Sequence, residues 1–188
     1  MNWFRRRTFA PATPVERRSL PQTVLEAIPA DQRGGPHERL EDGRFVIVGR
    51  DVVIVADDEK ILDSGFWHEV QFAAWKADTR LFTLVWSQPG RPQVVGRTVG
   101  DQVNDLMEKI SSRVGNTVVA TRRFVTDSGT HVAASVRRRI DGKLFSAVVA
   151  GGPISEVDEE KAYRLEEELR AELNMAPTSE DRPAEGPA

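Results

Sequence analysis

The sequence predicts an α+β protein made of two antiparallel units, in each of which the strands come first and a helix follows. Two observations lead to this prediction. Residues 44–97 are dense in β-branched and aromatic residues, and an amphipathic helical pattern follows them. Residues 116–150 repeat this plan with three strands joined by tight turns, ahead of a last, acidic helix. A chain of 188 residues suits one domain or two small, tightly packed halves.

Residues 1–40 are expected to form a basic, Pro-rich and weakly ordered N-terminus. They contain five prolines, and residues 1–18 hold five arginines against one acidic residue. One short helix is predicted from about Leu20 to Ile28, with Ser19 as its N-cap. Pro21 suits the first turn of such a helix, and Pro29 ends it.

The first unit, residues 41–115, is predicted to have five strands and a helix. The first two strands are continuous apolar runs at 45–48 and 52–55, so both of their faces should be covered. Gly49-Arg50 between them predicts a two-residue type II′ turn. The other three strands are expected at 66–75, 80–86 and 93–97.

A Trp-rich hairpin is the most distinctive part of this unit. A two-residue turn at Asp78-Thr79 would place Trp75 opposite Phe82, Ala73 opposite Leu84, and Gln71 opposite Trp86. The other face would then pair Phe72 with Val85 and Ala74 with Thr83. Both faces would carry apolar side chains, which predicts a hairpin packed on two sides.

The helix of the first unit is predicted from about Gly100 to Val114. Thr98-x-x-Asp101 could cap its start, and Gly115 suits the position after its end. Its apolar stripe consists of residues at helical spacing: Val103, Leu106, Met107, Ile110 and Val114.

The second unit, residues 116–175, is predicted to be a three-stranded antiparallel meander with strands at 116–126, 130–140 and 143–150, plus a helix. Asp141-Gly142 is a type I′ turn signal, and it would pair Arg138 with Phe145. One face would then be buried, and its members are mostly apolar: Val118, Ala120, Phe124, Val132, Ala134, Val136, Phe145, Ala147 and Val149. The opposite, solvated face would be positive, with Arg123, Arg137 and Arg139 together on it.

Ser155 is the expected N-cap of the last helix, and an apolar seam runs along it at Ala162, Leu165, Leu169 and Leu173. Residues 155–174 hold eight acidic against three basic residues, which indicates a solvated acidic helix face. Residues 176–188 are rich in Pro, Glu and Ala and are expected to be a disordered tail.

These features together resemble a group of uncharacterised actinobacterial proteins with a pleckstrin-homology-like (PH-like) first half. The resemblance rests on the Arg-rich opening, the run Val-Ile-Val-Gly-Arg-Asp-Val-Val-Ile-Val, and the Trp-His-Glu-Val strand followed by Trp75. It also rests on Arg113-Val114-x-x-Thr117 and on the ending at 153–173. The group carries no assigned activity onto this chain. The resemblance implies only a generic tendency to bind phosphoinositides or proteins, and the loop Gly49-Arg50-Asp51 lacks a compact basic pocket for an inositol phosphate.

The amino-acid composition excludes some kinds of chemistry and disfavours some partners. The chain has no Cys, which excludes disulfides and thiolate chemistry and fits a reducing cytoplasm. The net charge of -3 points to no global attraction for nucleic acid. No secretory signal and no membrane-spanning run is recognised, so a cytoplasmic protein is expected.

His68-Glu69 begins like a zinc-protease motif, but Phe72 stands where the second His would be. No metal and no cofactor is therefore predicted.

The sequence favours a non-enzymatic binding or scaffold protein over an enzyme, without deciding the question. Arg123, Arg137 and Arg139 are the candidate binding residues, for an acidic protein surface or an anionic lipid. Nucleic acid is the less favoured partner, because that face lacks stacking aromatics. Two alternatives stay open. These arginines could instead pair with the acidic last helix, or the protein could be a small enzyme with its active site between the two units.

Overall fold

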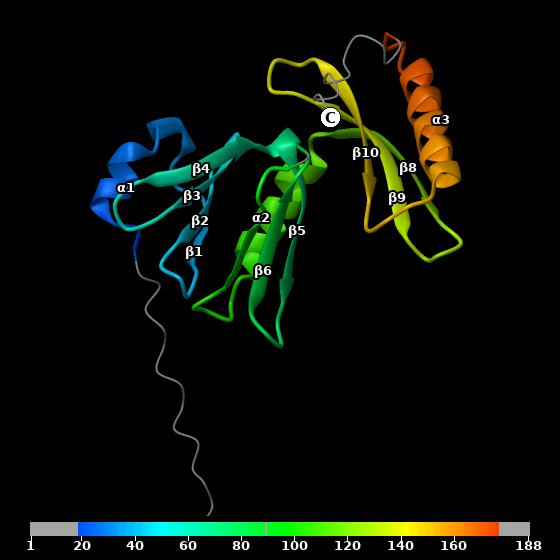
Figure 1. Cartoon of the computed structure of the whole chain (residues 1–188). Helices are drawn as coiled ribbons and strands as arrows, with labels where there is room; N and C mark the ends of the chain where they lie inside the picture. The colour runs from blue at the N-terminus through cyan, green and yellow to red at the C-terminus, as the bar shows by residue number, and fades with distance from the viewer. Residues whose placement is uncertain (1–18, 89, 177–188) are drawn as a thin grey trace, which may run out of the picture.

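The computed structural model describes residues 19–88 and 90–176, and it has the predicted α+β class with antiparallel sheets (Figure 1). In the described part of the chain, ten strands form a four-stranded sheet and two three-stranded sheets. The α-helices are α1 (Gln22–Ala27), α2 (Asn104–Gly115) and α3 (Glu156–Glu172). The strands are β1 (His37–Arg39), β2 (Phe45–Val48), β3 (Val52–Ala56), β4 (Ile61–Phe66), β5 (Val70–Lys76), β6 (Leu81–Trp86), β7 (Val94–Arg97), β8 (Val118–Val125), β9 (His131–Arg138) and β10 (Leu144–Ala150).

The predicted count of five strands for the first unit is wrong, because this unit has a sheet β1-β2-β3-β4 and a sheet β5-β6-β7. The sequence prediction missed β1, which has only three polar residues, and β4, whose Asp63-Ser64-Gly65 is typical of a turn. Residues 19–40 are also more ordered than expected, since they form α1, the short 3-10 helix η1 (Ala30–Gln32) and β1. The predicted disorder of residues 1–18 and 177–188 falls outside the described residues.

Strands β2 and β3 are covered on both faces, as their apolar runs predict. Val46, Val48, Val53 and Val55 face the main core, whereas the alternate residues pack against α1. The turn between these strands is not type II′, because Gly49 does not adopt a positive φ. The Gly49 N–H donates instead to the Val52 carbonyl over 2.8 Å, and a Cβ on Gly49 would lie 2.8 Å from that oxygen. Close backbone approach is therefore what requires glycine here.

The Trp-rich hairpin has most of its predicted register, since Trp75 pairs with Phe82 and Ala73 with Leu84. The pairing of Gln71 with Trp86 is wrong, because a β-bulge at Gln71 makes Val70 the partner of Trp86. Only the face toward the main core is buried. The Phe72 side chain on the other face is 47% exposed, so the expected two-sided packing is also wrong.

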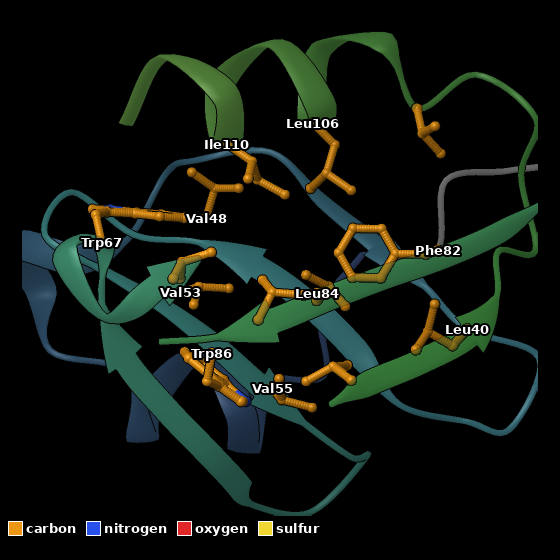
Figure 2. Close-up of a cluster of buried hydrophobic side chains, with 14 residues drawn as sticks. Leu40, Val48, Val53, Val55, Trp67, Phe82, Leu84, Trp86, Leu106 and Ile110 are labelled. Atoms are coloured by element: carbon orange, nitrogen blue, oxygen red, sulfur yellow. The ribbon is translucent and has the colours of Figure 1, made fainter. Parts of the chain in front are cut away.

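The main core lies between the two sheets of the first unit and α2 (Figure 2). The predicted apolar stripe of α2 is confirmed, with Leu106 and Ile110 buried in this core. The helix itself begins at Asn104, and its N-cap Val103 offers no capping side chain. Thr98 and Asp101 therefore do not cap it. The core consists of Leu40, Val46, Val48, Val53, Val55, Trp67, Val70, Phe82, Leu84, Trp86, Val94, Val103, Leu106 and Ile110.

The second unit is the predicted meander with α3 packed on one face, away from the first unit (Figure 1). The predicted register of β10 is wrong by one residue, since Leu144 pairs with Arg138 and Phe145 with Arg137. The loop occupies residues 139–143 with a positive φ at Gly142 alone, whereas a type I′ turn needs two such residues. This shift moves Phe145, Ala147 and Val149 from the α3 side to the opposite face.

The core under α3 is small. Its buried members are Ala134, Val136 and Leu169, with Leu144 and Val148 packed against them. Ser155 caps α3 as predicted, because its hydroxyl accepts from the Asp158 N–H at 3.2 Å. In the described part of the chain, no helix is long and apolar enough to cross a membrane.

Candidate functional site

The three predicted binding arginines lie along the face of the β8–β10 sheet opposite α3, here called the open face. Arg123 on β8 pairs with Ala133 of β9, which is four residues from Arg137. Because a strand advances by about 3.3 Å per residue, Arg123 and Arg137 are separated by about 13 Å along the strands. Arg139 follows β9 at the far end of this line. Arg123 and Arg139 are exposed, whereas Arg137 is only 7% exposed.

The expected solvated position of Arg137 is therefore wrong, because its guanidinium is inserted between the two units. Nη1 donates to the Val70 carbonyl and, at 3.4 Å, to the His68 carbonyl, while Nη2 donates to the Gln71 carbonyl at 3.2 Å. The bulge at Gln71 interrupts the regular ladder here, so these carbonyls are available to a side chain. Burial lowers the pKa of Arg137. The guanidinium has the planar fork needed to bind several carbonyls together.

An aromatic stack lies beside this guanidinium and completes the contact between the units. Phe66 stacks on His68 with ring centroids 5.5 Å apart, and Phe145 meets the edge of His68 at 5.7 Å. The Phe145 contact depends on the corrected register of β10. The imidazole belongs to the short 3-10 helix η2 (Trp67–Glu69) and is 8% exposed as a residue.

The electrostatic surroundings favour a neutral His68. Burial is the main cause of its lowered pKa, and the positive charges of Arg139 and Arg137 act in the same direction. The carboxylates of Glu69 and Asp141 oppose this shift. Across residues 19–88 and 90–176, no three His, Cys, Asp or Glu side chains come close enough to hold a metal ion.

The alternative interpretation, in which the candidate arginines pair with the acidic last helix, holds only for the neighbouring Arg122 among the described residues. Arg122, on the α3 side of β8, forms an ion pair with Glu172. Neither Arg123 nor Arg139 forms an ion pair within the part of the chain that the structure describes. Both charges are exposed on the open face.

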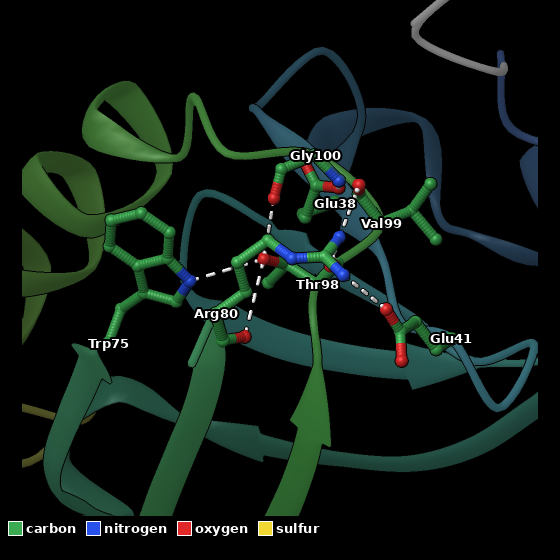
Figure 3. A network of polar contacts seen from close by, with 7 residues as sticks. All are labelled: Glu38, Glu41, Trp75, Arg80, Thr98, Val99 and Gly100. Atoms are coloured by element: carbon green, nitrogen blue, oxygen red, sulfur yellow. Dashed lines mark hydrogen bonds and ion pairs between the residues drawn. The ribbon is translucent and has the colours of Figure 1, made fainter. Parts of the chain in front are cut away.

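A second polar cluster, in the first unit, is structural (Figure 3). Arg80 has a positive φ of 53°, and its Nη1 donates to the carbonyls of Thr98 and Val99 at 2.8 and 2.9 Å. Its Nη2 pairs with Glu41 at 2.6 Å. The buried Thr98 hydroxyl accepts from Trp75 Nε1 at 3.1 Å. These contacts fasten the segment after β7 to the turn after β1.

Sequence reasoning missed His68 and Phe145 as parts of the contact between the units. His68 sits in a segment that was predicted as strand, and its ring partners come from β4 and β10. No local pattern links His68 to Phe145, which lies 77 residues further along the chain. The sequence contains one signal, the run of Arg137, Arg138 and Arg139. Successive side chains in a strand point to opposite faces, so this run must place arginine on both faces of the sheet.

Comparison of the chain with protein-family models, with curated proteins and with solved structures finds no match.

Proposed function

We propose that this protein is a non-enzymatic binding or scaffold protein whose open face docks an acidic segment of a partner protein. The observation that carries the proposal is the exposure of Arg123 and Arg139, both without an ion pair among the described residues, on the sheet face opposite α3. Arg137 lies between them and holds the two units together, so it positions the face instead of contacting the partner.

The spacing of the two exposed arginines favours an extended partner over a small anion. They lie at opposite ends of the face, about 20 Å apart at six residues of strand, so one phosphate could not reach both. A partner segment with acidic groups about 20 Å apart contacts both, on either side of the buried Arg137. Long-range attraction between such charges raises the association rate and weakens with salt.

The PH-like character of the first unit and a cytoplasmic location remain parts of this proposal. The order of antiparallel strands followed by a packed helix supports the first, and the absence of Cys supports the second. The enzyme alternative has less support, because the space between the units holds Phe66, His68, Phe145 and a guanidinium bonded to backbone carbonyls.

Fluorescence anisotropy with labelled polyglutamate tests the proposal. The double variant Arg123→Ser/Arg139→Ser should bind about tenfold more weakly than the unmodified protein, and binding should weaken with added salt. The matched control is Arg122→Ser/Arg138→Ser, which removes the same charge from the α3 side of the same strands. It should retain most of the affinity.

Two results would count against the proposal. Equal weakening by both double variants would mean that net charge, not the open face, governs binding. Binding to phosphatidylserine vesicles without binding to polyglutamate would replace the acidic protein with an anionic membrane.

A further inference from the structure

The edge strands of the described sheets differ in how they are protected against pairing with another chain. The three sheets have six edge strands: β1, β4, β5, β7, β8 and β10. Natural proteins protect such edges with charges, bulges or short length, because an edge presents unpaired N–H and C=O groups to other chains.

Five of these edges carry such protection. Bulges lie in β4, β5 and β8, as the register shifts at Leu62, Gln71 and Val119 show. These three strands also contain charged residues, and β1 and β7 are short strands that end in Arg39 and Arg97.

Strand β10 lacks all of these features. Its seven residues, Leu-Phe-Ser-Ala-Val-Val-Ala, include no charge, proline or glycine, and it pairs with β9 over its whole length without a bulge. It lies at the edge of its sheet, beyond β9 from β8 (Figure 1).

The hydrogen bonds at the two ends of β10 establish which of its residues face outward. The Arg139 N–H donates to the Lys143 carbonyl, and the Gly151 N–H donates to the His131 carbonyl. An antiparallel ladder alternates, so the odd-numbered residues of β10 bond to β9. The backbone groups of the even-numbered residues point away from the sheet: Leu144, Ser146, Val148 and Ala150. Within residues 19–88 and 90–176 they have no hydrogen-bond partner.

We propose that β10 pairs antiparallel with β10 of a second copy of this chain, about a two-fold axis at Ala147. This register makes Leu144 face Ala150 of the second copy and Ser146 face its Val148, so every outward backbone group meets an outward group. Phe145 then lies beside Val149 of the second copy, which is an aromatic and β-branched pair. No charge meets a like charge. The two three-stranded sheets become one six-stranded sheet with α3 of both copies on the same side.

The affinity of this pairing is expected to be modest. The α3 helix lies mainly over β9. The β9 strands of the two copies would be three strand spacings apart, about 14 Å, so the two α3 helices do not pack directly. The interface is one strand pair with its neighbouring side chains, and the fraction of dimer should therefore change with protein concentration.

Sedimentation analysis over about two orders of magnitude in concentration tests the proposal with the full chain. The mass should rise from the 21.0 kDa monomer toward twice that value. Ala147→Lys should abolish the rise, because it places two ammonium groups against each other at the axis. Val125→Lys is the matched control, since it adds the same charge on the same face of the opposite edge strand, and it should leave the dimer intact.

A charge-exchange experiment separates loss of pairing from loss of folding. Ala147→Glu alone should also be monomeric, whereas an equimolar mixture of Ala147→Lys and Ala147→Glu should form a dimer. In the unmodified dimer, hydrogen exchange should protect the amides of Ser146 and Val148, and in the monomeric variants it should not. A monomer at all concentrations, a mixture that stays monomeric, or an equal effect of Val125→Lys would overturn the proposal.

Discussion

Replacing Arg137 tests whether one guanidinium joins the two units. In Arg137→Ser the carbonyls of His68, Val70 and Gln71 lose their donor. Hydrogen bonds from a charged donor contribute about 1.5–3 kcal/mol each, and a buried carbonyl without a partner costs about 1–3 kcal/mol. Removing a buried charge recovers part of its desolvation cost. A net loss of about 3 kcal/mol in the free energy of unfolding is therefore expected.

This loss corresponds to a fall of about 6–12 °C in Tm for a chain of this size. The assay is thermal and urea unfolding followed by circular dichroism. Arg123→Ser is the control, because it removes an exposed arginine from the same face, and it should change stability by less than about 0.5 kcal/mol. Arg137→Lys should lie between the two, since an ammonium group cannot replace the planar fork. The reasoning is refuted if Arg137→Ser and Arg123→Ser unfold at the same temperature within about 2 °C.

Three further predictions concern stability. Because the folded protein lowers the pKa of His68 below its ordinary 6.5, only the unfolded chain gains this proton as the pH falls from about 6.5. Stability should drop in that window down to the lowered pKa, and His68→Phe should remove this part of the pH dependence; parallel curves for the two proteins would contradict it. Gly115→Ala should stabilise α2 by about 0.5–1 kcal/mol, because nothing lies within 4 Å of the added Cβ. Gly65→Ala should destabilise by about 1–3 kcal/mol, because its Cβ would lie 2.5 Å from the Trp86 ring. Urea unfolding of both glycine variants checks the two signs.

Patterns that depend on one strand or one helix predicted the fold well. The apolar runs of β2 and β3 are covered on both faces, and the stripe of α2 faces the core. The register of the Trp-rich hairpin was also predictable next to its loop. The loop has four residues, 77–80, where two were expected, but both lengths are centred on Asp78 and Thr79.

Features that need a distant partner were not predictable. A single extra residue in the loop 139–143 reversed the faces of β10, because side chains alternate with a period of two. The bulge at Gln71 shows no sequence signal, and its carbonyl is satisfied by Arg137, which lies 66 residues further along the chain. The burial of Arg137 follows from that contact. Strand alternation alone predicts a solvated position for this arginine, but in the structure it lies in the contact between the two units.

The small core under α3 has a consequence for the order in which the protein forms. The apolar cluster under α3 has three buried members, compared with fourteen in the main core of the first unit. A unit with so little buried apolar surface gains little from folding by itself. The first unit is translated before β9, and N-terminal parts of a chain generally fold first. We therefore expect the first unit to fold first, and the second unit to complete its folding when Arg137 binds the carbonyls of η2 and of the start of β5.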